Sequence, residues 1–465
     1  MSIANGMPHM QHSRAIHGVS SHRRNWLRQA GAVTASGLLG ASSPNSLAVD
    51  SSYRALVVVH LNGGNDGNNL VVRTDTAYSD YEDSRQNLAI PKRSLKGLNG
   101  SVDGQTYGLH PALAPLADIY HQQRLSIISN VGPLIEPATA EQVLSNKVRV
   151  PAFLGSHNDQ TSMVQGWNPL EDNSGWAGRS LERFPENLRN PINAVTMDTN
   201  RTLVLGHQSP VSFLETGGGS NWGPADFARP ETSAAQAIMR MARWQFSNDY
   251  EAEYARTFGQ AVNDSVRFTR AFLSAGESQF DFGNDGIGPQ LRTLASVLPV
   301  LKSQGLRRQV FLVHWGGFDT HANQRGPGMF TQDTQLGQLA KGLAAFDETN
   351  KRNGLADEVI TLVISEFGRT VRPGSGGGSE HAWGSHWFAM GGRVRGGTVV
   401  GRFPDLRLGG PDDADGGRNG RLVPVTSSDQ VGAAAMVWMG LPITEIYSVF
   451  PNLKHFASPL SPILI

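Results

Sequence analysis

The stretch RALVVVHLNGGNDGNN, residues 54–69, decides the fold class that we predict for this chain. Its first eight residues form a nearly continuous apolar run with several β-branched side chains, and glycines follow it. This pattern is typical of a strand that is buried on both faces, and such strands belong mainly to parallel sheets covered by helices. The polar residues that follow the strand, among them Asp66, are then expected at one edge of the sheet.

Beyond this stretch the chain alternates between helical patterns and short apolar strands. The predicted helix and strand pairs are 111–121 with 125–129, 291–301 with 309–314, and 336–346 with 359–365. Each helix shows apolar residues three and four positions apart, which place them on one helical face. Repeated alternation of this kind predicts an α/β fold, a mostly parallel sheet with helices on both faces.

The middle of the chain differs from this alternation. Residues 233–275 carry a long helical pattern, and we predict a helical insertion at about 225–285 within a single domain spanning 49–465. Aromatic and β-branched residues recur there at four-residue steps, from Tyr250 and Tyr254 to Val266. We interpret this stripe as packing.

The N-terminal segment has the order of regions found in a secretory signal. Arg23 and Arg24 precede an uncharged stretch at 30–42, and small residues end at Ala48. Basic region, apolar region and small-residue site in this order predict a signal peptide over 1–48, and the paired arginines indicate the twin-arginine route. We therefore expect the twin-arginine translocase as a partner during export, and a mature protein that is periplasmic or secreted.

Composition narrows the classes of partner. The chain has 40 Lys and Arg residues and 40 Asp and Glu residues, so its formal net charge is zero. No overall electrostatic field therefore favours binding to nucleic acid or to an anionic membrane surface. The chain has no cysteine, which agrees with a protein that folds before export. The mature chain has no second long apolar segment, and we expect no stable membrane span in it.

Side chains suited to metal binding or catalysis gather directly after the predicted strands. They are Asp66, Asp319 with His321, Glu366 with Arg369, and His381 with His386. Because ligands bind outside the carboxyl ends of parallel strands, these clusters are expected to meet at one sheet edge. The glycine-rich loop 372–379 is expected to be flexible, so that the segment after it approaches the site.

Asp, Glu and His side chains suit one or two divalent ions such as zinc, manganese or magnesium. The predicted metal ligands are Asp66, Asp319, His321, Glu366 and His381. Such ions stabilise charge on a transferred phosphoryl or sulfuryl group, so the predicted substrate is an anionic ester. Arg369 is a candidate contact for an anionic substrate oxygen, and His386 is a candidate peripheral ligand or general acid.

Structural roles remain open for the same residues. Asp66 could shape a turn, and Asp319 with His321 could form a hydrogen-bonded structural pair. Glu366 and Arg369 could form a buried ion pair. His386 could be a packed histidine.

Six segments resemble the family known as domain of unknown function 1501. They are 61–72, 107–120, 154–163, 316–324, 364–369 and 380–406, in family order across nearly the whole mature chain. The resemblance implies a relation to the alkaline phosphatase and sulfatase superfamily, whose α/β folds perform metal-assisted phosphate or sulfate ester chemistry at strand ends.

The resemblance also implies roles by position. Asp66 resembles the ligand of one ion, and Asp319, His321 and His381 resemble ligands of the other. Glu366 occupies the place of a usual aspartate ligand, and Ser156 falls near the position of the nucleophile.

The chain departs from the superfamily at Phe367, which stands where a ligating histidine is usual. The absence of cysteine excludes the formylglycine nucleophile of sulfatases. The leading hypothesis is an exported metal-dependent hydrolase of a phosphate or sulfate ester. The alternative is a non-catalytic exported protein that keeps the scaffold for binding.

Overall fold

The computed structural model describes most of the chain after the predicted signal. The described residues are 51–99, 104–167, 171–217, 233–241 and 243–465. The predicted signal peptide therefore lies outside the described residues, as does part of the predicted insertion. Residues Asp50–Ile465 form one compact unit.

A mainly parallel sheet forms the centre of this unit, with strand order β11-β5-β10-β9-β1-β8-β6-β7. The strands are β1 (Arg54–Leu61), β5 (Leu125–Gly132), β6 (Ala194–Thr196), β7 (Ser212–Phe213), β8 (Arg308–Trp315), β9 (Val359–Ser365), β10 (Ser385–Met390) and β11 (Thr398–Val400), with β12 (Thr426–Ser427) beside β5. Only β10 among these runs antiparallel to its neighbours, β5 and β9. The predicted mixed α/β fold with a mainly parallel sheet is confirmed.

The register of the three central strands determines where the site can form. Leu61, the last residue of β1, is level with Trp315 of β8 and Ser365 of β9. The loops that follow these strands therefore start side by side at one sheet edge.

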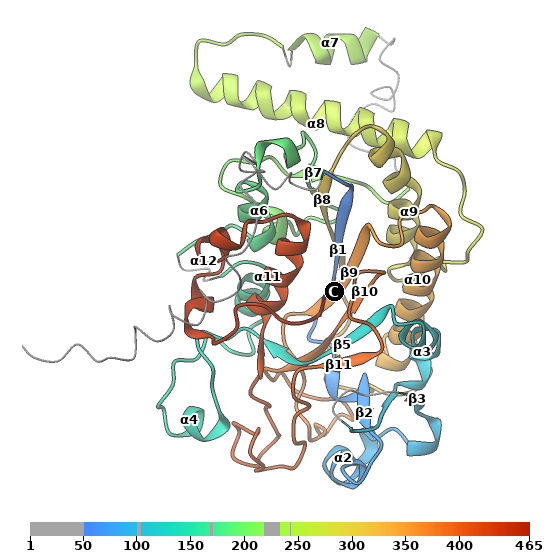
Figure 1. The fold of residues 1–465 in the computed structure, drawn as a ribbon, viewed down its shortest axis with the longest axis vertical. Coiled ribbons are helices and arrows are strands. Elements are labelled where there is room, and N and C mark those ends of the chain that lie inside the picture. The colour runs from blue at the N-terminus through green and yellow to red at the C-terminus, as the bar shows by residue number, and fades with distance from the viewer. Residues whose placement is uncertain (1–50, 100–103, 168–170, 218–232, 242) are drawn as a thin grey trace, which may run out of the picture. The chain divides into compact units, whose positions relative to one another are not determined.

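Helices cover both faces of the sheet, as Figure 1 shows. On one face lie α3 (Ala114–His121), α9 (Gly288–Ser303) and α10 (Gln332–Arg352); on the other lie α6 (Trp176–Leu181), α11 (Ser428–Met439) and α12 (Ile446–Val449). Alternate residues of β1 enter the two cores: Val57 and Val59 join the first, Leu56 and Val58 the second. This division is the physical reason for the continuous apolar run.

The middle segment is helical, with α7 (Ser233–Met241) and α8 (Asp249–Ser274). The packing interpretation of its aromatic stripe is wrong for the first two positions. Tyr250 and Tyr254 are 88% and 72% exposed, whereas Val262 further along α8 is buried. The stripe meets the core only in the later part of the helix.

Three more helices and a second, small sheet belong to the unit. They are α2 (Tyr78–Arg85), α4 (Ala140–Leu144), α5 (His157–Gln165), and the small sheet of β2 (Val71–Arg73), β4 (Tyr107–Leu109) and β3 (Lys96–Leu98). Among the helices that the structure describes, none combines the length and apolar character needed to cross a bilayer.

Candidate metal centre

Three side chains from distant parts of the chain converge beyond the ends of the central strands. One ligand atom each from His157, Asp319 and His381 lies within 4.8 Å of the other two. His157 is the first residue of α5, Asp319 lies in the loop after β8, and His381 precedes β10. Two imidazoles and a carboxylate are ligands that zinc and similar ions accept.

The Asp319 carboxylate is the hub of this group. Its Oδ1 lies 3.0 Å from Nε2 of His381 and 3.0 Å from Nε2 of His321, and its Oδ2 lies 3.5 Å from Nε2 of His157. Partial burial raises the pKa of Asp319, but the hydrogen bond from Arg369 and the close contact with the His381 ring outweigh this effect and lower the pKa to about 2. Asp319 is therefore an anion at all ordinary pH values.

Each of the three histidines has its other ring nitrogen held by an oxygen. Nδ1 of His157 lies 3.0 Å from Glu366, Nδ1 of His381 lies 2.7 Å from the carbonyl of Gly155, and Nδ1 of His321 lies 2.7 Å from Glu380. A carbonyl can only accept, so Nδ1 of His381 carries the proton. Metal-binding histidines are commonly oriented in this way, with Nδ1–H bonded to a carboxylate or carbonyl and Nε2 facing the ion.

The Nε2 atoms of His321 and His381 are only 3.0 Å apart. With both rings neutral and protonated on Nδ1, two lone pairs would face each other, which is unfavourable unless a proton or a cation lies between them. The side chains present therefore fit a divalent cation, with His157, Asp319 and His381 as the closest set and His321 beside it.

Glu366 lies behind His157 instead of facing the group directly. Its side chain is fully buried and accepts hydrogen bonds from the backbone N–H of Gly63 at 2.7 Å and the Ser365 hydroxyl at 3.2 Å. Burial raises the pKa of Glu366, but the bond from His157 and the nearby His60 lower it overall. The same bond to Glu366 raises the pKa of His157. Glu366 thus orients His157.

Arg369 is also buried, and its guanidinium is bonded mainly to the protein backbone. It donates to the carbonyls of Gly63, Gly64 and Ser379 and to the Asp319 carboxylate. Arg369 pairs with Asp319, and no bond between Arg369 and Glu366 is present. The geometry makes Arg369 a positioning residue for Asp319, and its predicted contact with a substrate anion stays a prediction.

Backbone pairing brings His381 and His321 together. Arg369 forms an antiparallel bridge with His381, and Ala322 forms another with Gly377. The 372–379 loop therefore lies along the 320–324 segment, held by Ser379 N–H to the Thr320 carbonyl at 3.1 Å. A side chain at Gly378 would place its Cβ 2.2 Å from that carbonyl, so glycine permits this close approach.

The structure does not bring Asp66 into the group. The Asp66 carboxylate is fully buried and forms an ion pair with Arg85 of α2. It also accepts hydrogen bonds from the Gln324 side chain at 2.5 Å and from the backbone N–H of Asn68 at 3.0 Å. The bond from Asn68 caps the start of a short 3-10 helix, Gly67–Asn69. These bonds are structural, and its role as a metal ligand stays a prediction.

His386 likewise lies in the interior, on β10. Its ring stacks on Phe403, and its Nδ1 accepts from the backbone N–H of Asn130 at 3.1 Å. Burial lowers the pKa of His386 to about 3. A neutral, buried imidazole is a poor source of protons, so this geometry favours the packed histidine among the roles left open.

Ser156 precedes His157 and caps α5, with its hydroxyl bonded to Asp159. Its role as nucleophile stays a prediction. His157 itself was missed in the sequence, because its segment was assigned to Ser156 and no spacing rule links it to Asp319.

Phe367 packs against His157 and His381 at ring centroid distances of 4.9 and 4.7 Å and forms an apolar wall.

Residues 53–412 match the model of the family described as protein of unknown function (DUF1501). The chain belongs to this family. The six segments that carry the resemblance all lie within the match. In this chain His157, Asp319 and His381 lie in three of these segments, 154–163, 316–324 and 380–406.

No curated protein matches this DUF1501 chain in sequence. Among solved structures, it is similar to the lipoteichoic acid synthase LtaP from Listeria monocytogenes (9% identity, TM-score 0.32, covering 85% of this chain and 74% of that one). It is also similar to the PsFucS1 sulfatase from Pseudoalteromonas sp. (10% identity, TM-score 0.32, coverage 87% and 70%). A third is the C-terminal periplasmic domain of EcEptC from Escherichia coli in complex with Zn (9% identity, TM-score 0.33, coverage 89% and 92%). Similarity at this level gives no residue correspondence, so function must be argued from the side chains of this chain.

Proposed function

We propose that this protein is an exported, metal-dependent hydrolase of a phosphate or sulfate ester. The observation that carries the proposal is the convergence of His157, Asp319 and His381, with His321 beside them, each imidazole held through Nδ1. Such an arrangement is typical of a metal centre with an outer layer of orienting groups. Zinc and manganese suit its imidazole and carboxylate donors best.

A divalent cation held here supplies positive charge that stabilises the negative charge developing on an ester oxygen. The protein side chains do the remaining work. Glu366 and the Gly155 carbonyl fix the imidazoles of His157 and His381, Arg369 fixes Asp319, and Phe367 excludes water from one side. These groups hold the donor atoms in place before the substrate arrives, which lowers the reorganisation needed for reaction.

Ser156 is the proposed nucleophile. Its Oγ donates a hydrogen bond to Asp159, which accepts the hydroxyl proton as Oγ bonds to the phosphorus or sulfur atom and the alcohol of the ester leaves, taking up a proton from water. Water then hydrolyses the serine ester, which releases phosphate or sulfate and restores the Ser156 hydroxyl group. A Ser156→Ala variant that keeps full activity would transfer this role to water.

Export by the twin-arginine route is part of the proposal, and an R23K/R24K variant should then accumulate in the cytoplasm.

Metal titration of the purified protein tests the centre directly. We expect about one equivalent of zinc or manganese to bind, and His157→Ala to weaken binding by more than about 100-fold. His207→Ala is the matched control, because His207 is likewise a histidine near a carboxylate, Asp172, at 3.1 Å, but it lies outside the metal centre. If neither metal binds, or if the two variants behave alike, the metal centre is wrong.

Turnover is tested separately with aryl phosphate, phosphodiester and sulfate esters in the presence of the bound metal. Activity that is lost in Asp319→Ala supports the hydrolase. Full metal occupancy without turnover of any of these esters would instead favour the alternative, a binding protein that keeps the scaffold. Phe367 is the observation behind that alternative, because an apolar ring stands where a second ion would need a ligand.

A further inference from the structure

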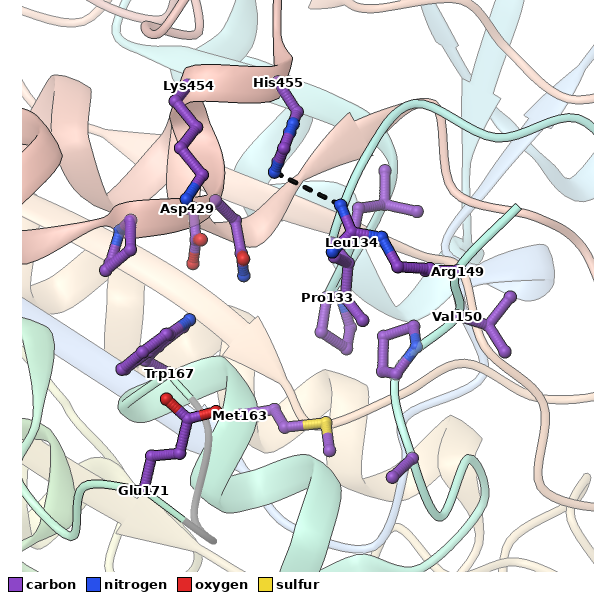
Figure 2. Close-up of a pocket in the computed structure, with 15 residues that line it drawn as sticks. Pro133, Leu134, Arg149, Val150, Met163, Trp167, Glu171, Asp429, Lys454 and His455 are labelled. Atoms are coloured by element: carbon purple, nitrogen blue, oxygen red, sulfur yellow. Dashed lines mark hydrogen bonds between the residues drawn. The ribbon is translucent and has the colours of Figure 1, made fainter. Parts of the chain in front are cut away.

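A cavity of about 350 Å³ lies beside α5, and none of its lining residues belongs to the metal centre. Figure 2 shows its walls. Arg149 and Val150 come from the segment before α5, and Trp167 from the segment after it. Asp429 belongs to the first turn of α11, and Lys454 to the short helix Pro451–His455 near the C-terminus. Its volume is in the range of small-molecule sites.

One side of the cavity is apolar and includes an aromatic ring. Trp167 and Met163 line it together with Leu134 and Pro151. An indole offers a flat apolar face and a polar edge, which suits a ligand that is itself apolar on one face and polar at its rim.

The opposite side carries a buried carboxyl group. Asp429 is only 6% exposed, and the Asn452 side chain, which also lines the cavity, hydrogen-bonds to it. Burial raises the pKa of Asp429 to about 7, against the opposing charge of Arg179. Near neutral pH this carboxyl group can therefore both donate and accept hydrogen bonds.

The charges around the cavity are close to balanced. Arg149 pairs with the Glu136 carboxylate at 3.1 Å, which offsets its charge, and it also lies 3.3 Å from Nε2 of His455. Lys454 and Glu171 contribute opposite charges to the lining. A strongly charged ligand would thus face both signs, whereas a neutral, hydrogen-bonding ligand would be accommodated.

We infer that this cavity binds a neutral six-membered sugar ring, stacked on Trp167 and hydrogen-bonded through its hydroxyl groups to Asp429 and Asn452. Such a ring has an apolar face of C–H groups and a rim of hydroxyls, which matches the two sides of the cavity. Two features of the lining carry the inference: the Trp167 ring suits the apolar face of the sugar, and the Asp429 and Asn452 side chains suit its hydroxyl groups.

The cavity is connected to the metal centre by one short stretch of chain. The lining residues 149–152 continue through Phe153 and Gly155 to His157, and Met163 lies six residues along α5, or ~9 Å of helix rise. Phe153 is 58% exposed and adopts a positive φ of 56°, which is unusual for a bulky residue. The cavity and the metal centre are thus joined along the chain, and the inferred sugar site depends on the lining of the cavity, whether or not the proposed function holds.

Binding to the sugar cavity is measured on the metal-free mature protein, so that it does not depend on hydrolase activity. The probes are the methyl glycosides of glucose, galactose, mannose, fucose, xylose and N-acetylglucosamine, followed by ligand-observed NMR. We expect at least one to saturate with a dissociation constant below about 10 mM. Trp167→Ala should weaken this binding by at least about tenfold, by loss of stacking. Trp244→Ala is the matched control, because Trp244 is exposed at a site remote in sequence.

Asp429→Asn keeps the shape of the side chain and one donor and acceptor, so it should bind the same glycoside within about threefold, whereas Asp429→Leu should lose binding. The inference is overturned if no glycoside saturates, if Trp167→Ala binds like Trp244→Ala, or if inorganic sulfate or phosphate competes for the cavity. Glycoside binding without ester turnover would leave the sugar site standing and remove the hydrolase. Turnover of aryl esters without glycoside binding would do the reverse.

Discussion

The buried ion pair between Asp66 and Arg85 gives the sharpest test of how this site is built. Both side chains are fully buried, and Asp66 also accepts from Gln324 and the Asn68 N–H. Asp66→Ala would leave the Arg85 guanidinium in the interior without its anion. Removing one partner of a buried pair costs about 3 to 5 kcal/mol, because the remaining charge stays desolvated.

For a folded unit of this size the loss corresponds to a fall of about 3 to 6 °C in the thermal unfolding midpoint. Asp75→Ala is the matched control, because Asp75 pairs with Arg73 at 2.8 Å but both side chains are about one-quarter exposed. A pair of that exposure contributes about 1 kcal/mol or less. The double variant Asp66→Ala/Arg85→Ala should lose less stability than the two single variants summed, since no unpaired charge remains.

The assay combines thermal unfolding with metal titration on the same samples. We expect Asp66→Ala to lower the unfolding midpoint while the affinity for zinc or manganese stays within about threefold of the wild type. Two results would refute this reasoning. One is a midpoint no lower than that of Asp75→Ala, and the other is a folded Asp66→Ala protein that has lost metal binding, which would make Asp66 a ligand.

Three further predictions concern groups around the site. Glu366→Gln should lower metal affinity by about 10- to 100-fold through loss of orientation of His157, measured by titration calorimetry, whereas the exposed Glu253→Gln should leave the affinity unchanged. Asp429 has a folded pKa of about 7, above its unfolded value, so the protein becomes less stable as the pH rises from about 4 to 7. Asp429→Asn cannot ionise, so it should be more stable than the wild type above pH 7 by up to about 4 kcal/mol. At pH 4 it should show no such advantage, and denaturant unfolding at the two pH values measures the difference. The His386 ring should remain neutral in NMR spectra down to about pH 4, and a ring that protonates near pH 6.5 in the folded protein would contradict its burial.

The sheet could be predicted from sequence because its strands are buried on both faces. β1 and β9 occupy the predicted residues, and β8 extends one residue beyond the prediction at each end. A strand covered by helices on both sides is apolar at most positions, and this signal is contained within the seven or eight residues of the strand. The aromatic stripe of α8 carried no comparable information, since whether Tyr250 meets a core depends on segments far along the chain.

The residues of the candidate metal centre could be predicted from the sequence only in part. Asp319, His321 and His381 were found because each follows a recognisable strand or lies in a glycine-flanked segment. His157 begins a helix that is not directly attached to the central strands, and its contact with Asp319 spans more than 150 residues. No spacing in the sequence encodes such a contact.

Burial separates the two kinds of charged residue that look alike in the sequence. The side chains of the metal group are partly exposed, at 33% for His157, 46% for Asp319 and 23% for His381. The side chains of Asp66, Glu366 and Arg369 are not exposed at all, and each is bonded to groups of the protein. The partly exposed side chains leave donor atoms open to an arriving ion, whereas the buried side chains are satisfied by groups of the protein. In the sequence one or two charged or histidine residues follow each of these strands. Which of them we propose as ligands and which as positioning residues depends on their burial, to which contacts with Arg85, Gly155 and the 372–379 loop contribute.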